Sequence, residues 1–241
     1  NISLNKFMKA IILAGGKGTR LSEYTRYIPK PMIDIGGIPI LSHLIAIFNS
    51  YKFSEVIIAA GYKKKIISTY YKKKKVFKNI KVVDTGSNTM TGGRILRLKK
   101  FFKKDEIFLM TYGDGLCDIN LEKLIKFHKK HKKIATVTAV RPPIRFGELQ
   151  LKKNNFVKKF EEKPQLKSGW INGGFFILDY RIFDYIKNDQ TLFEREPMEN
   201  LAKNNNLVAY RYSGFWKCVD TLKDKIYLEK LYKKNKKIWK I

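Results

Sequence analysis

The 241-residue sequence has little cysteine, little arginine and no long apolar run. Cys117 and Cys218 are too few for a disulfide framework or a cysteine-based zinc site, so we expect a reducing compartment, the cytoplasm. No apolar run approaches the roughly 18 residues that a membrane-spanning helix needs, because the best candidate, residues 10–14, stops at Gly15. The sequence therefore predicts a soluble protein without a membrane partner.

The charge of the chain is strongly one-sided. Its 50 basic residues outnumber its 21 acidic residues and give a net charge of +29, which by itself suggests a nucleic-acid partner. Only nine of the basic residues are arginines, however, and arginine is the side chain that base-reading surfaces favour. The lysines are scattered along the chain, so we favour solvated lysine-rich faces and expect no specific nucleic-acid partner.

Short apolar runs alternate with helical apolar patterns. Residues 9–13 predict a buried strand, residues 40–48 a helix with one apolar face, and residues 55–60 a second strand. The other expected strands cover residues 81–83, 107–112, 135–140, 148–151, 156–160, 174–178 and 208–212, and the clearest other helices cover residues 121–131, 197–204 and 221–232. This alternation predicts one α/β domain with a largely parallel central sheet, covered by helices on both faces. Such sheets bind ligands at the carboxyl ends of their strands.

A glycine-rich loop follows the first predicted strand. Residues 15–21 read Gly-Gly-Lys-Gly-Thr-Arg-Leu, so backbone N–H groups can approach a phosphate while Arg20 adds a bidentate cation. The loop lacks the spacing of the dinucleotide fingerprint and of the P-loop, and a tight structural turn is the alternative interpretation. Lys30 follows between two prolines, a rigid setting that favours contact between its ammonium group and an anion.

Two aspartates follow predicted strands. Asp114 lies between two glycines directly after residues 107–112, and Asp220 lies at the start of the helix expected at residues 221–232. Carboxylates at the carboxyl edge of a sheet can bind a cation. A turn residue is the alternative role for Asp114, a helix N-cap is the alternative for Asp220, and Asp118 is a rival for Asp114 that lacks the flanking glycines.

Residues 8–32 begin Met-Lys-Ala-Ile-Ile-Leu-Ala-Gly-Gly-Lys-Gly-Thr-Arg-Leu and end Pro-Lys-Pro-Met, and they resemble the opening of the sugar-phosphate nucleotidylyltransferases. The cytidylyltransferase branch of that family resembles the chain most, through Val-Asp-Thr-Gly at 83–86, Met-Thr-Gly-Gly-Arg at 90–94, Thr-Tyr-Gly-Asp-Gly at 111–115 and Gly-Phe-Trp at 214–216. The resemblance implies a single-domain, Rossmann-like nucleotidyltransferase fold over residues 8–241, preceded by an N-terminal extension of residues 1–7.

The resemblance also implies an activity and a set of site residues. The activity is the Mg²⁺-assisted transfer of CMP from CTP to α-D-glucose 1-phosphate, with release of pyrophosphate, in a homo-oligomer. The implied catalytic residues are Arg20, Lys30 and Lys163, and the implied Mg²⁺ ligands are Asp114 and Asp220. The nucleotide is expected to contact Leu13, Gly15, Gly16, Gly18, Thr19, Arg20, Lys30, Thr91, Gly92 and Arg94. The sugar phosphate is expected to contact Gly147, Glu162, Lys163 and Asn172.

Several alternatives stay open. Without the resemblance, Glu162 and Lys163 could form an exposed ion pair of little consequence, and residues 91–94 a helix cap or a hairpin turn. We expect the backbone of residues 91–93 to offer donors and acceptors to a pyrimidine edge. Residues 71–81 are shorter than the family pattern, so UTP, dTTP or another sugar phosphate could be the substrate. A catalytically silent relative and a basic nucleic-acid-binding protein are the alternatives from other classes.

Overall fold

The computed structural model describes residues 8–73, 79–141, 148–153, 155–161, 169–234 and 239. The strands are β1 (Lys9–Ala14), β2 (Asp34–Ile35), β3 (Ile38–Pro39), β4 (Glu55–Ala60), β5 (Ile80–Asp84), β6 (Ile107–Tyr112), β7 (Gly115–Cys117), β8 (Ala135–Val140), β9 (Glu148–Leu151), β10 (Val157–Glu161), β11 (Ile171–Asp179), β12 (Leu207–Tyr212) and β13 (Trp216–Cys218). The α-helices are α1 (Ser22–Thr25), α2 (Ile40–Ser50), α3 (Lys64–Lys73), α4 (Thr91–Arg97), α5 (Leu121–His131), α6 (Glu196–Lys203) and α7 (Leu222–Lys234). Short 3-10 helices are η1 (Thr19–Leu21), η2 (Lys30–Met32), η3 (Lys99–Phe101) and η4 (Tyr180–Tyr185).

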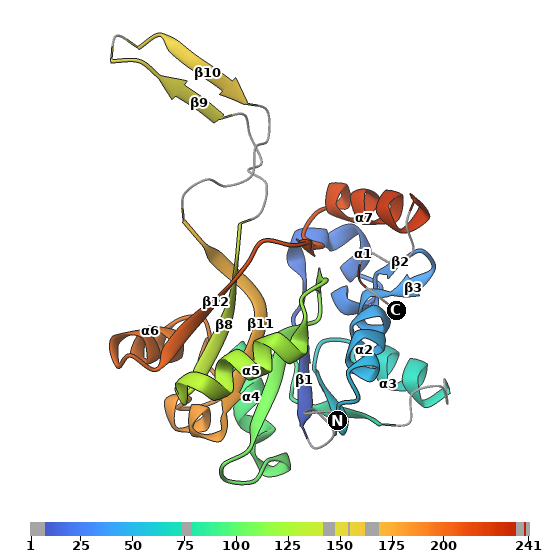
Figure 1. The fold of residues 1–241 in the computed structure, drawn as a ribbon. Coiled ribbons are helices and arrows are strands. Elements are labelled where there is room, and N and C mark those ends of the chain that lie inside the picture. The colour runs from blue at the N-terminus through green and yellow to red at the C-terminus, as the bar shows by residue number, and fades with distance from the viewer. Residues whose placement is uncertain are drawn as a thin grey trace.

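A seven-stranded sheet in the order β12-β8-β11-β6-β1-β4-β5 forms the centre of the molecule (Figure 1). Neighbouring strands are parallel except at β11, which runs antiparallel to both β6 and β8. The prediction of a largely parallel sheet is therefore confirmed, with one reversed strand inside it.

Helices cover both faces of this sheet. Side chains alternate along each strand, so the apolar residues of the strands point to both faces and need cover on each. In β1, Ile12 belongs to an apolar cluster with Leu44 of α2 and Leu124 of α5, while Ile11 belongs to a second cluster with Ile95 of α4. The first cluster also takes in α3 and α7, and the second takes in η4 and α6. The predicted covering of both faces is confirmed.

The parallel strands β1, β4, β5 and β6 end at one edge of the sheet, and the reversed strand β11 begins there. The end of β8 meets the start of β11, since Val140 is paired with Ile171. The chain between these two residues contains the β9–β10 hairpin, in which Leu149 is paired with Phe160. Figure 1 shows this hairpin standing apart from the sheet.

Some elements differ from the expected ones. The predicted strand at residues 174–178 extends to Ile171–Asp179, and α3 was not predicted. The helix α3 buries only Ile67 and Tyr71, so its apolar period is weak in a lysine-rich segment. The N-terminal extension, residues 1–7, lies outside the described residues. Among the described residues, none of the helices combines the length and the apolar character that crossing a membrane requires.

Candidate functional site

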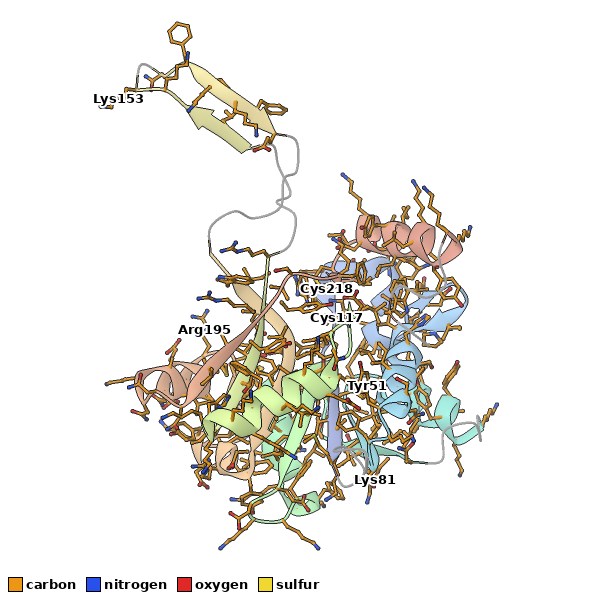
Figure 2. All side chains as sticks on the ribbon, in the orientation of Figure 1. Tyr51, Lys81, Cys117, Lys153, Arg195 and Cys218 are labelled. Atoms are coloured by element: carbon orange, nitrogen blue, oxygen red, sulfur yellow. The ribbon has the colours of Figure 1, made fainter. Side chains whose placement is uncertain are left out.

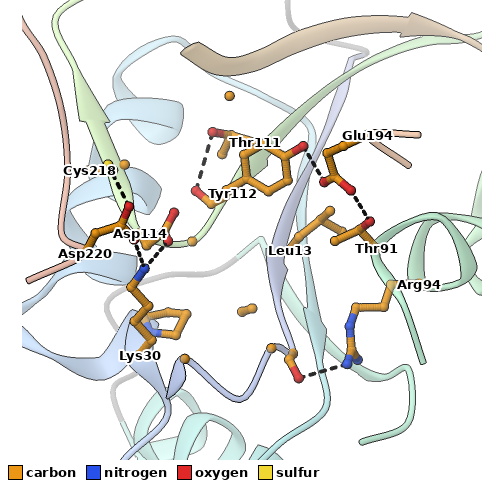
Figure 3. Close-up of a pocket in the computed structure, with 18 of the residues that line it drawn as sticks. Leu13, Lys30, Thr91, Arg94, Thr111, Tyr112, Asp114, Glu194, Cys218 and Asp220 are labelled. Atoms are coloured by element: carbon orange, nitrogen blue, oxygen red, sulfur yellow. Dashed lines mark hydrogen bonds and ion pairs between the residues drawn. The ribbon is translucent and has the colours of Figure 1, made fainter. Parts of the chain in front are cut away.

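A pocket of about 560 Å³ opens at the edge where the parallel strands end. Its walls are the glycine loop after β1, the start of α4, the end of β6, the start of β11 and the segment from β13 to α7 (Figure 3). Segments that are far apart in the sequence meet here because parallel strands bring their carboxyl ends to the same edge.

Most of the predicted site residues line this pocket. They are Leu13, Gly15, Gly16, Gly18, Arg20, Lys30, Thr91, Arg94, Asp114, Asn172 and Asp220. Thr19 and Gly92 are not among the lining residues. Gly147, Glu162 and Lys163 lie outside the described residues, so their expected contacts stay predictions.

Lys30 holds the two predicted metal ligands together. Its Nζ atom lies 2.5 Å from Oδ2 of Asp114 and 2.6 Å from Oδ1 of Asp220 (Figure 3). Arg20 approaches Asp220 from the other side, with Nη1 2.6 Å from Oδ2. Asp118 does not join this cluster, because its Oδ1 accepts a hydrogen bond from the hydroxyl of Tyr212. The cluster therefore contains two carboxylates and two cations.

Lys30 and Asp220, the buried members of the cluster, are kept charged by their ionic contacts in spite of burial. Burial disfavours a charged Lys30, which is 7% exposed, but the carboxylates of Asp114 and Asp220 outweigh burial and raise the pKa of the ammonium group. Burial likewise opposes ionisation of Asp220, but Lys30 and Arg20 outweigh it and hold the pKa of that carboxyl below its usual value. Lys30 and Asp220 are therefore both charged, and the ammonium group of Lys30 occupies the position between the two aspartates.

The same two carboxylates fit a divalent metal ion. They already converge on one cation, and carboxylate oxygens are the ligands that Mg²⁺ prefers. Over the described part of the chain, no group of three or more His, Cys, Asp or Glu side chains could hold a metal. A hard ion here would therefore complete its coordination with phosphate oxygens and water, as Mg²⁺ does in phosphoryl-transfer sites.

Arg94 lines the pocket, and its guanidinium connects the segments that follow β1 and β5. Its guanidinium donates hydrogen bonds to the carbonyl of Gly15 at 2.8 Å, the carbonyl of Gly86 at 2.6 Å and the hydroxyl of Thr85 at 2.9 Å. A Cβ atom at Gly15 or Gly61 would overlap the guanidinium, so both positions need glycine. Arg94 is only 4% exposed, and both terminal nitrogens of its guanidinium donate to the protein. These bonds hold the glycine loop in place, and the expected contact of Arg94 with the nucleotide stays a prediction.

The Nucleotidyl transferase family model matches residues 9–234 of the chain. The protein belongs to the nucleotidyl transferase family. The glucose-1-phosphate cytidylyltransferase of Salmonella typhimurium is 44% identical to it, over 97% of this chain and 99% of that protein.

Solved structures agree with this fold. HddC from Yersinia pseudotuberculosis, in a complex with GMP-PN, gives a TM-score of 0.73 at 26% identity, over 94% of this chain and 100% of that one. A UDP-glucose pyrophosphorylase in a complex with UDP-glucose gives a TM-score of 0.71 at 19% identity, over 95% of this chain and 99% of that one. The nucleotidyltransferase fold predicted from the sequence is confirmed.

The glycine loop of this nucleotidyl transferase provides a test of the role of Arg94. Gly15→Ala is expected to lower the free energy of unfolding by about 1–3 kcal/mol, because the guanidinium cannot yield to the new Cβ without losing hydrogen bonds. Gly16→Ala is the matched control, since a Cβ there meets nothing within 4 Å. Chemical denaturation measures both changes, and equal stability of the two variants would contradict this role of Arg94.

The start of α4 differs from the sequence interpretation. The N–H groups of Gly92 and Gly93 both point to the carbonyl of Thr191, at 2.9 and 3.3 Å, and a Cβ on either glycine would overlap backbone atoms of residues 189–191. These two amides are therefore not free to face a pyrimidine edge, and the rest of the expectation for residues 91–93 stays a prediction. The glycines are needed for close packing of α4 against the segment before α6, which the sequence motif does not reveal.

Sequence analysis missed a polar group on the same wall. The carboxylate of Glu194 accepts hydrogen bonds from the hydroxyls of Tyr112 and Thr91, each at 2.6 Å, and all three residues line the pocket. Burial, followed by the nearby Glu194, raises the pKa of Tyr112, so its hydroxyl stays protonated and donates. No motif surrounds Glu194. Tyr112 could have been found from the sequence, because it ends β6 two residues before Asp114.

The two cysteines flank the site without forming a disulfide. Cys117 on β7 is paired in register with Trp216 on β13, and Cys218 lies two residues further along β13 (Figure 2). Burial, with Asp220 and Asp114 nearby, raises the pKa of the Cys218 thiol to about 12. Cys218 therefore lines the pocket as a neutral thiol, which is a poor nucleophile.

Proposed function

We propose that this nucleotidyl transferase transfers CMP from CTP to α-D-glucose 1-phosphate, giving CDP-glucose and pyrophosphate. The observation that carries the proposal is the convergence of Asp114 and Asp220 on Lys30 and Arg20 beside a glycine loop. The identity to a glucose-1-phosphate cytidylyltransferase supports the choice of substrates.

The chemistry needs alignment and charge neutralisation more than a strong base. An oxygen of the sugar phosphate is already anionic at neutral pH and can attack the α-phosphorus of the nucleotide directly. The new bond joins that oxygen to the α-phosphorus, the bond from the α-phosphorus to the bridging oxygen breaks, and its electron pair leaves with pyrophosphate. No covalent enzyme intermediate is needed, which agrees with the neutral thiol of Cys218.

The cations of the pocket have separate tasks. Lys30, fixed by its buried position, supports the α-phosphate where negative charge develops. Arg20 has a side chain that is 69% exposed, so it can leave Asp220 and follow the departing pyrophosphate. The loop of residues 15–18 supports the same phosphates through its backbone N–H groups. Lys163 is expected to hold the sugar phosphate.

Asp114 and Asp220 are proposed to hold Mg²⁺. When bound, Mg²⁺ would neutralise phosphate charge and help to align the reacting oxygens. The two aspartates supply the anionic ligands, while Lys30 and Arg20 exchange carboxylate partners for phosphate oxygens. Assembly into a homo-oligomer and a cytoplasmic location also stay proposals.

Pyrophosphate release tests the substrate assignment. Purified protein would be assayed with CTP, UTP, dTTP, ATP and GTP against a panel of sugar 1-phosphates. We expect CTP with glucose 1-phosphate to give the highest kcat/KM, at least roughly tenfold above UTP, because a site built to pair with the cytosine amine would leave its own acceptor unpaired opposite the uracil carbonyl.

The outcomes separate the competing functions. Equal or better use of UTP or dTTP would overturn the cytidylyl assignment and leave the nucleotidyl transferase reaction in place. No release of pyrophosphate with any pair would favour a catalytically silent relative, although Arg20, Lys30, Asp114 and Asp220 are all in place.

A further inference from the structure

The segment that carries Asp220 is tied to the segment that carries Asp114. Cys218 on β13 is paired with Gly115 on β7, and the N–H of Val219 donates to the carbonyl of Asp114 at 2.9 Å. These backbone contacts fix one side of Asp220. Its other side depends on the start of α7.

Asp224, the third residue of α7, fixes that other side. Its Oδ2 atom accepts hydrogen bonds from the N–H of Asp220 at 3.1 Å, the N–H of Thr221 at 2.8 Å and the hydroxyl of Thr221 at 2.8 Å. The pair Thr221 and Asp224 forms a capping box, in which the carboxylate normally serves the residue just before the helix. The bond to Asp220 extends this cap by one residue, into the pocket wall.

A lysine from β13 holds Asp224 in turn. Nζ of Lys217 lies 2.5 Å from Oδ1 of Asp224, so one carboxylate oxygen faces the strand before Asp220 and the other faces the turn after the strand. Asp224 is 9% exposed. Closing a helix end requires only the contacts to Thr221. The contacts to Asp220 and Lys217 are not needed for the cap, and they hold the Asp220 peptide in place.

We propose that Asp224 is a positioning residue that sets the direction of the Asp220 carboxylate toward a divalent cation. This inference rests on the metal role given to Asp220 under Proposed function. Groups that orient a metal ligand typically change metal affinity about 10–100-fold when they are removed. The effect acts through the backbone of Asp220, because Asp224 is not among the residues that line the pocket.

The test compares the affinity of the full-length protein for CTP in the presence of Mn²⁺ with its affinity in EDTA, by calorimetry. The ratio of the two affinities measures the metal contribution without any turnover. Asp224→Ala is expected to reduce this ratio at least about tenfold and to leave the affinity in EDTA nearly unchanged. Asp224→Asn keeps an acceptor oxygen but loses the charge that Lys217 contacts, so a smaller reduction is expected and folding is less at risk.

A helix cap elsewhere provides the matched control. Asn120 caps α5 through a hydrogen bond from the N–H of Lys123 at 2.9 Å, and it does not line the pocket. Asn120→Ala should lower the melting temperature much as Asp224→Ala does and leave the affinity ratio unchanged.

The outcomes also separate this inference from the proposed function. The positioning role alone would be overturned if the ratio of CTP affinities in Mn²⁺ and in EDTA fell in Asp220→Asn but stayed high in both Asp224 variants. High here means equal to the ratio of the control Asn120→Ala. A wild-type ratio of one, unchanged by Asp220→Asn, would overturn the metal role of Asp220 and this inference with it.

Discussion

Asp114→Asn and Asp220→Asn are each expected to lower turnover at least about 100-fold while the protein stays folded. Each substitution keeps the shape of the side chain and removes one of the two charges that converge on the cation position. A lost electrostatic contact to the reacting phosphates has an effect of this size because it stabilises charge that develops in the transition state. Steady-state release of pyrophosphate at saturating CTP and glucose 1-phosphate measures the loss.

Asp118→Asn is the control for these two variants. Asp118 lies on the same segment as Asp114, but it bonds to Tyr212 outside the pocket lining, so its turnover should stay near that of the wild type. Circular dichroism checks that all three variants are folded. Near-normal turnover of either Asp114→Asn or Asp220→Asn would remove that residue from the proposed metal site.

Lys30→Met is expected to lower turnover by a similar factor and, at the same time, to make the free protein bind Mn²⁺ more tightly. The two carboxylates and the cations Lys30 and Arg20 balance in charge, so a metal ion alone gains little from entering the cluster. Without Lys30 the carboxylates keep a net negative charge. The variant should lose about 3 kcal/mol of stability without metal, since the buried Asp220 and the half-buried Asp114 both lose a partner.

Mn²⁺ titration with thermal unfolding tests this second prediction. Added Mn²⁺ should raise the melting temperature of Lys30→Met more than that of the wild type, because a ligand that binds the folded state stabilises it. Lys9→Met is the matched control, since it removes another partly buried ion pair, with Glu106 at 3.1 Å, at the opposite end of β1. If Lys30→Met and the wild type respond equally to Mn²⁺, Lys30 does not compete with the metal.

Local sequence patterns predicted much of the fold. The strand β1, the helix α2 and the strand β4 follow from runs of apolar residues with clear periods, and the glycine loop follows from its place after β1. Most of the predicted site residues line one pocket because parallel strands share their carboxyl edge. That geometric rule requires no knowledge of which strands are neighbours.

The remaining features depend on contacts between distant segments. The apolar pattern of β11 is the same whether it runs parallel or antiparallel to β6, so its reversal was not predictable. The carbonyls that hold Arg94 are backbone atoms, which every residue possesses, so the sequence could not show that its guanidinium donates to them. Glu194 stands in a turn without a motif, and only the fold brings it to Tyr112 and Thr91.

The pairing of Val140 with Ile171 has a consequence for how acceptor specificity can evolve. The sheet holds the two ends of the segment of residues 141–170 together. A longer segment would therefore cost little stability, because the entropic cost of closing a loop grows only slowly with its length. Three residues expected to contact the sugar phosphate, Gly147, Glu162 and Lys163, belong to this segment, while the loop of residues 15–18 and Lys30 lie before it in the chain. If these residues contact the sugar phosphate as proposed, an insertion or exchange between residues 141 and 170 would alter the acceptor side of the site and leave the register of the sheet as it is.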